Sequence, residues 1–169
     1  NIISLLHGSD NLSQLFQWCM NLAVGFSIYF FASTRLSNKV GLLCMVLYHL
    51  MPKIIVLSST SKSDIAFFGY IIMSLHMLFY WKEKKEYKYF WLSSLFTGLS
   101  MSAKTQGLLW AISIGILVLI MLYQMYRNVP SKIVKLFISY SLMATVIVLP
   151  WYIRNYINTG DPIWPFGFP

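Results

Sequence analysis

Long apolar stretches, almost free of charged residues, constrain what this chain can fold into more than any other feature of its sequence. Six of them lie at residues 12–34, 40–57, 65–81, 89–103, 108–126 and 133–150. Hydrophobic residues make up 57% of the chain and charged residues 11%, whereas soluble domains carry about 25% charged residues. Because no water hydrogen-bonds the backbone inside a bilayer, and because the stretches show no strand-like alternation, each is expected to be a helix. We therefore predict an all-α, polytopic membrane helix bundle with about six transmembrane helices.

The basic residues between these stretches predict the orientation of the bundle. Segments 35–39, 82–88 and 127–132, together with Lys135, contain nine Lys or Arg, and the segments on the opposite side contain three. Cytoplasmic loops of membrane proteins are enriched in Lys and Arg, so the first set is placed in the cytoplasm and both chain ends outside. The net charge of +8 then follows from topology and gives no reason to expect a nucleic-acid partner.

Two regions are predicted along the chain: a transmembrane helix bundle at 1–150 and an extracytoplasmic interfacial segment at 151–169. The chain starts at Asn1 and stops at Pro169 without a closing signal, so we interpret it as an excerpt of a longer polypeptide. Cys19 and Cys44 lie in apolar stretches and are interpreted as small hydrophobic residues rather than as a disulfide.

Polar residues gather in three places on the predicted outer side, and the first is the turn at 58–64. Pro52 lacks a backbone N–H and disturbs the second apolar stretch, and a run of hydroxyl residues follows at 58–61. Asp64 stands where a helix N-cap belongs, just ahead of the next apolar stretch. A capping role and a role in a site are both open for Asp64, because this position lies at the outer rim.

The second place is the join between the fourth and fifth stretches, where Lys104 lies with almost no loop around it. A lysine there either extends to the lipid headgroups or contacts a phosphate in a wet cavity. On the fourth stretch Ser94, Gly98 and Ser102 recur at every fourth residue, which predicts that a neighbouring helix approaches closely. That stretch has 15 residues, which is short for a full crossing.

The third place is the aromatic segment at 150–166 that leaves the sixth stretch. Its Trp and Tyr residues are expected in the membrane interface, and a turn is predicted at 159–162. Arg154 in this segment pairs either with a lipid phosphate or with the phosphate of a donor molecule, and the sequence leaves both open.

Two histidines, His49 and His76, lie within apolar stretches and are expected to form interhelical hydrogen bonds rather than to bind a metal. No cluster has metal-ligand spacing, and no nucleophile, phosphate-loop or zinc motif is present in the sequence. No cofactor is indicated, and the need for a divalent metal is left open.

The three outer segments, in this order, resemble the GT-C membrane glycosyltransferases, in particular the bacterial branch related to protein O-mannosyltransferases and lipid A aminoarabinose transferases. The first is a Ser/Thr-rich turn that ends in Asp, at 58–64. The second is a Gly-Leu-x-x-x-x-Lys-Thr join, at 98–105. The third is a Pro-Trp-Tyr-x-Arg-Asn segment followed by Thr-Gly-Asp-Pro and an aromatic-Pro pair, at 150–165.

The resemblance implies transfer of a sugar from a polyprenyl-phosphate donor to a lipid, glycan or protein hydroxyl, on the outer face of the cytoplasmic (inner) membrane. We expect donor-phosphate contacts from Lys104, Arg154 and Lys62, the last at a position where the family would have a less basic residue. Asp64 and His7 would shape the cavity. The acidic base of such enzymes is expected in a large outer loop upstream of this excerpt, which alone would be inactive.

Two other classes of protein are open alternatives to the transferase. A transporter or flippase of lipid-linked sugars would share the apolar stretches and the outer cations, but it should show half-repeats and broken helices near the bilayer midplane, and the sequence indicates neither. A non-catalytic membrane scaffold would use the outer polar turns only as helix caps.

Overall fold

A computed structural model describes residues 11–60 and 62–163 of the chain, and every regular element in them is an α-helix. The helices in this part are α2 (Asn11–Ser33), α3 (Asn38–Leu50), α4 (Pro52–Ser58), α5 (Asp64–Lys84), α6 (Tyr87–Ala103), α7 (Gly107–Tyr126) and α8 (Pro130–Thr159). Their contacts divide the chain into two compact units, Asn1–Met73 and Ser74–Pro169, with the boundary inside α5. The prediction of an all-helical protein is confirmed, and each unit is described in turn.

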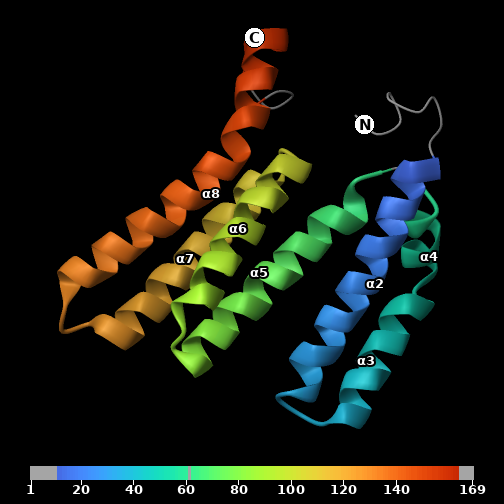
Figure 1. The fold of residues 1–169 in the computed structure, drawn as a ribbon, viewed down its shortest axis with the longest axis horizontal. Coiled ribbons are helices and arrows are strands. Elements are labelled where there is room, and N and C mark those ends of the chain that lie inside the picture. The colour runs from blue at the N-terminus through green and yellow to red at the C-terminus, as the bar shows by residue number, and fades with distance from the viewer. Residues whose placement is uncertain (1–10, 61, 164–169) are drawn as a thin grey trace. The chain divides into compact units, whose positions relative to one another are not determined.

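Unit 1, Asn1–Met73, contains an antiparallel hairpin of α2 and α3 with α4 packed against α2 (Figure 1). The hairpin turns within the predicted cytoplasmic segment 35–39, where the Ser37 hydroxyl caps α3 by accepting from the Val40 N–H at 3.3 Å. Gly41 allows the two helices to approach here, because a Cβ at this position would lie 2.8 Å from the Tyr29 carbonyl oxygen. The turn is therefore fixed by a cap and by a close helix contact.

The second apolar stretch is not one straight helix, and the disturbance that we expected at Pro52 is confirmed. It divides into α3 and α4, which meet at an angle of 67°. Met51 between them has an extended backbone, with ψ of 121°. Pro52 begins α4, and its missing N–H and its ring prevent α3 from continuing through it.

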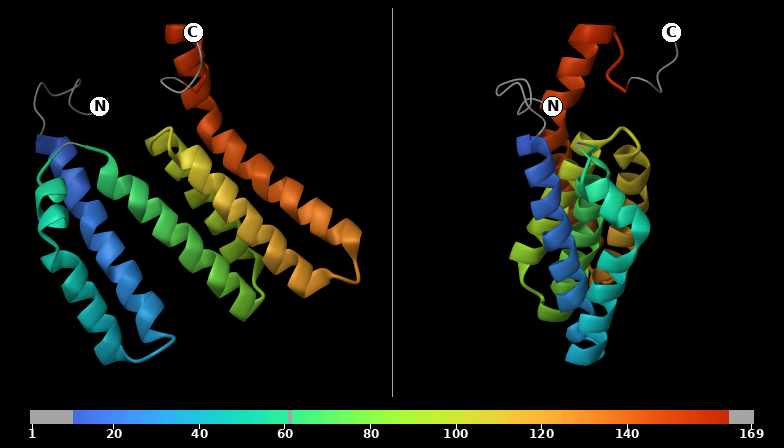
Figure 2. Two further views of the ribbon diagram at one scale, coloured as in Figure 1. Left: turned by 180° about the vertical axis from the view of Figure 1, so that it is seen from behind. Right: turned by 90° about the vertical axis from the view of Figure 1, so that its right-hand side faces the viewer.

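Unit 2, Ser74–Pro169, is an antiparallel arrangement of the second half of α5 with α6, α7 and α8 (Figure 1, Figure 2). Short connections join these helices within the predicted cytoplasmic segments 82–88 and 127–132. The buried core lies toward these connections, where the rings of Trp81 and Phe90 pack with centroids 4.6 Å apart. The remaining buried residues of this core are Leu78, Ile114, Val118, Met121, Leu122 and Tyr140.

The predicted stripe of small residues on α6 meets α8, and the expected close approach is confirmed. A Cβ on Gly98 would lie 2.7 Å from the Ala144 carbonyl oxygen. One turn earlier, the Ser94 hydroxyl donates to the Tyr140 carbonyl oxygen at 2.6 Å. The backbones of α6 and α8 can approach closely because Gly98 has no side chain and Ser94 has a short polar one.

Helix α8 continues through Pro150 to Thr159, so the predicted interfacial segment begins as part of the same helix. Its 30 residues span about 45 Å at 1.5 Å per residue, which exceeds the roughly 30 Å of a bilayer core. Gly160 ends the helix with φ of 76°, a left-handed conformation that glycine adopts without strain. The predicted turn follows, where Asp161 Oδ1 accepts from the Ile163 N–H at 2.9 Å.

The described helices agree with a membrane protein. Four of them are long and apolar enough to cross a bilayer, or five if the bent α3–α4 pair is one span. An exposed apolar stripe recurs at every fourth residue of α8, at Val134, Ile138, Leu142 and Val146, where lipid would cover it. Helix α6 has only 17 residues and is not among these spans. A total of six spans and two outward-facing termini therefore stay predictions.

Candidate functional site

The predicted phosphate-binding residue Lys104 lies in a tight turn between α6 and α7. Its N–H donates to the Ser100 carbonyl oxygen at 3.3 Å, and its own carbonyl oxygen accepts from the Gly107 N–H at 2.8 Å. Only glycine fits at 107, because a Cβ there would collide with the Ser100 carbonyl oxygen. The short connection therefore holds the half-buried Lys104 directly at the ends of both helices.

The second predicted cation, Arg154, lies on the last part of α8 and is exposed. Its guanidinium carbon is 5.1 Å from the centroid of the Trp151 ring, a distance at which the cation and the ring attract each other. Because α6 and α8 run parallel to each other and α7 runs antiparallel to both, the α6–α7 turn and the end of α8 lie at the same end of unit 2 (Figure 1, Figure 2). The structure thus places Lys104 and Arg154 at one end of this unit.

The other predicted site residues belong to unit 1 or fall outside the description. Lys62 is exposed, and Asp64 lies in the first turn of α5, one residue inside the predicted cap position. A carboxylate there still interacts favourably with the positive end of the helix dipole. His7 lies outside the described residues. That Lys62, Asp64 and His7 share a basin with Lys104 and Arg154 remains a prediction.

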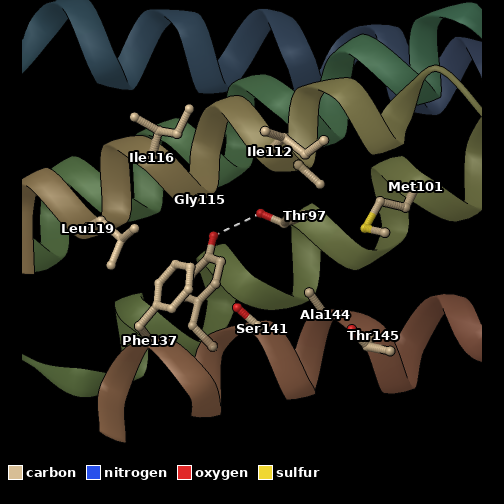
Figure 3. A pocket seen from close by; sticks show the side chains of 12 residues that line it. Thr97, Met101, Ile112, Gly115, Ile116, Leu119, Phe137, Ser141, Ala144 and Thr145 are labelled. Carbon is tan, nitrogen blue, oxygen red and sulfur yellow. Dashed lines mark hydrogen bonds between the residues drawn. The ribbon is translucent and has the colours of Figure 1, made fainter. Parts of the chain in front are cut away.

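An apolar cavity of about 330 Å³ lies between α6, α7 and α8 (Figure 3). The side chains of Ile112, Ile116 and Leu119 from α7 form one wall, and Phe137 of α8 closes one end. Thr97 and Met101 of α6 lie on the opposite side. The cavity is further lined by Ala111, Gly115, Tyr140, Ser141, Ala144 and Thr145. Its volume lies at the small end of the range for ligand pockets.

A closed ring of four hydroxyl groups, which we did not expect from the sequence, lies beside this cavity. The ring runs from Ser74 to Ser93 at 3.1 Å, on to Tyr140 at 2.9 Å, to Thr97 at 2.8 Å and back to Ser74 at 2.8 Å. Four hydroxyl protons suffice for these four contacts if each group donates to the next. The four groups are therefore buried and satisfy one another, and both Thr97 and Tyr140 also line the cavity. Figure 3 shows the Thr97 side chain at the cavity.

The signal for this ring was present in the sequence but incomplete. Ser93 and Thr97 stand four residues apart, one position before the small-residue stripe, and so share a face of α6. Nothing in the local sequence indicates that Ser74 of α5 and Tyr140 of α8 face the same point. The ring depends on the register of three helices.

Among the described residues, no group of three or more His, Cys, Asp or Glu is arranged to hold a metal ion. Cys19 and Cys44 are both free thiols.

Comparisons with known proteins give one family. A family model described as a domain of unknown function (DUF8201) matches residues 4–169. No curated protein and no solved structure matches the chain. Because the family model covers nearly the whole chain, the protein belongs to the DUF8201 family.

Proposed function

We propose that the protein is a membrane-embedded glycosyltransferase of the GT-C type, which moves a sugar from a polyprenyl-phosphate donor to a lipid, glycan or protein hydroxyl. It acts at the outer face of the cytoplasmic membrane. Lys104 and Arg154, at one end of unit 2, bind the donor phosphate.

The observation that supports this function best is the position of two cations relative to an apolar cavity between the same helices. Met101 lines the cavity and precedes Lys104 by three residues, about 4.5 Å along the α6 axis. Thr145 lines it on α8 and precedes Arg154 by nine residues, about 14 Å along that axis. An amphiphile with an anionic head and a hydrocarbon chain fits this arrangement, in which the apolar cavity is followed along α6 and α8 by the two cations.

The cations and the apolar cavity match the two parts of a polyprenyl phosphate, its charged head and its hydrocarbon chain. Hydrogen bonds between a cation and a phosphate are charge-assisted and are stronger than neutral ones. A cation at the phosphate also stabilises the charge that develops when the sugar leaves. The cavity offers apolar walls to the part of the prenyl chain next to the head, and the long amphipathic end of α8 extends into the interface above it.

The test measures binding of a polyprenyl phosphate and of the matching polyprenol to the intact protein in nanodiscs. The wild type should bind the phosphate more tightly, and Lys104→Ala should weaken that binding by about tenfold, the effect of about 1.4 kcal/mol. Lys135→Ala is the control, because Lys135 is exposed and is counted with the residues on the predicted cytoplasmic side. Equal affinity of the wild type for phosphate and alcohol would reject the donor assignment.

Turnover is measured with the same variants on a panel of polyprenyl-phosphate sugars. Release of the sugar to an acceptor, reduced in Lys104→Ala and in Arg154→Ala, is the expected result. Binding without release of any sugar from the panel would point away from a transferase.

One observation favours the second candidate function, a transporter or flippase of lipid-linked sugars. The α3–α4 pair is bent by 67°, and broken helices are common at the substrate sites of transporters. In proteoliposomes a flippase would move the intact lipid-linked sugar between leaflets without cleaving it. A transferase would cleave it, so analysis of the lipid product separates the two functions.

A further inference from the structure

Three polar side chains on one face of α2, in unit 1, are buried. Ser13, Gln17 and Asn21 are only 2%, 4% and 5% exposed, and their spacing of four residues places them on successive turns of the same face. The residues between them face outward, as Leu15 and Trp18 show with exposures of 58% and 51%. In a candidate membrane span this arrangement is unusual, because polar groups in hydrocarbon are costly unless they are hydrogen-bonded.

A fourth polar group from α3 extends this face by one turn. Gly25 follows Asn21 by four residues, and a Cβ at this position would collide with His49 Nε2. The neighbouring ring atoms Cε1 and Cδ2 of His49 would lie 3.0 Å and 3.2 Å from it. The Nε2 atom of His49 therefore lies directly against α2, at the position that a side chain of residue 25 would occupy.

Three atoms on this face are completely buried and have no hydrogen-bond partner within the described part of the chain: Gln17 Oε1, Asn21 Oδ1 and His49 Nε2. We call these three atoms the α2 acceptor line. Buried polar atoms in folded proteins almost always have a partner, so an unpaired group usually indicates a bound molecule. The expected interhelical hydrogen bond of His49 is not formed by its Nε2 atom.

The spacing of the α2 acceptor line selects the kind of molecule that fits. Side chains four residues apart on a helix are about 5–6 Å apart. A cation such as Ca²⁺ would need six to eight oxygen ligands, usually with carboxylates among them, and the α2 acceptor line offers two amide oxygens and one ring nitrogen. A helix from another chain cannot cover these atoms, because they are already buried within the chain.

Water matches this spacing. One molecule that donates both protons at about 2.8 Å joins two acceptors about 4.5 Å apart, a separation that the ends of side chains with Cβ atoms about 5–6 Å apart can reach. One water would then bridge Gln17 and Asn21, and a second would bridge Asn21 and His49, whose Nε2 atom can also donate to water. Ser13 lies on the same face nearer the start of α2, so the line of buried polar side chains extends toward that end of the helix.

We propose that the α2 acceptor line binds a row of ordered water molecules, which hydrates the interior of unit 1 from the N-terminal end of α2. This site is independent of the proposed transferase, because it uses no cation and none of the donor-binding residues. It would give water and its protons access to a depth of about 14 Å along α2, the distance from residue 12 to residue 21.

The first test compares how fast Ag⁺ blocks single cysteines of the protein in liposomes. Gln17→Cys and Asn21→Cys are made in a background that carries Cys19→Ala and Cys44→Ala. The control is native Cys19 with Cys44→Ala, because Cys19 is exposed on the outward face of α2 at the same depth. Thiols react as thiolates, which form only where water is present, so positions 17 and 21 should react at least about tenfold faster than Cys19. Equal or slower reaction would overturn the proposal.

The second test needs no substitution and so applies even if a cysteine variant misfolds. Solid-state NMR of the unmodified protein in bilayers measures the transfer of magnetisation from water to individual side chains. The transfer to Gln17 and Asn21 should be several times faster than to Val24, a buried apolar residue on the same helix that is 1% exposed. Transfer as slow as that to Val24 would mean that the acceptor line is dry.

Discussion

Replacement of Gly98 by alanine tests whether close contact between α6 and α8 holds unit 2 together. The new Cβ would lie 2.7 Å from the Ala144 carbonyl oxygen and 2.8 Å from Ile147 Cβ, and ordinary contact starts at 3.4 Å. The two helices must therefore separate by about 0.7 Å at this point. Neither neighbour is the end of a flexible side chain, so the backbone of α8 itself has to move.

This movement also affects the hydroxyl ring one turn away. Tyr140 of α8 contacts Ser93 and Thr97 of α6 at 2.9 Å and 2.8 Å, and a separation of about 0.7 Å would take both contacts beyond hydrogen-bond distance. Overpacking costs about 1–3 kcal/mol, and each lost interhelical hydrogen bond in a membrane protein adds about 0.6 kcal/mol. The higher helix propensity of alanine offsets about 1 kcal/mol. We therefore expect Gly98→Ala to lower the free energy of unfolding by about 2 kcal/mol.

The free energy of unfolding is measured by titration with SDS in mixed micelles, followed by tryptophan fluorescence. Gly115→Ala on α7 is the matched control, because its Cβ would meet only Phe137 Cε2, at 3.9 Å. The control should be neutral or stabilising by up to about 1 kcal/mol, the difference in helix propensity between glycine and alanine. If the two variants differ by less than about 0.5 kcal/mol, close contact at Gly98 does not carry the stability that we assign to it.

Two further variants test the hydroxyl ring and a backbone conformation by the same measurement. Tyr140→Phe removes one hydroxyl of the ring, and Ser93 and Thr97 each lose one hydrogen-bond contact, so we expect the free energy of unfolding to fall by about 1–2 kcal/mol. Ser139→Ala is the control and should be neutral, because the Ser139 hydroxyl bonds within its own helix. An equal loss in both variants would argue against a special role of the ring. Lys85 has φ of 60° just after α5, so Lys85→Gly should raise the free energy of unfolding by about 1 kcal/mol. Lys84→Gly, within α5, should lower it by a similar amount. Changes of the same sign in both variants would contradict the reasoning.

The helices and their connections could be predicted from the sequence because they follow from local properties. The apolar stretches 65–81 and 108–126 correspond closely to α5 and α7, and the basic segments between stretches contain the turns. The stripe of Ser94 and Gly98 correctly predicted a close helix contact, since small side chains at a four-residue spacing leave a groove on a helix. Proline was harder to interpret, because its effect depends on what surrounds it. Pro52 starts a new helix after a bend of 67°, whereas Pro150 lies within a continuous one.

The two polar features that the sequence did not reveal have a common physical cause. A hydroxyl or an amide in a membrane helix is acceptable only if its partner lies across a helix contact, and that partner is set by the rotation and register of two or three helices. Ser74, Ser93, Thr97 and Tyr140 find each other and close a ring, so they need no solvent. Gln17 and Asn21 on α2 are similarly buried, but their side-chain oxygens have no such partner in the described chain. By the same rule we expect the second group to be hydrated. A dry acceptor line would show that burial alone does not predict where water enters this bundle.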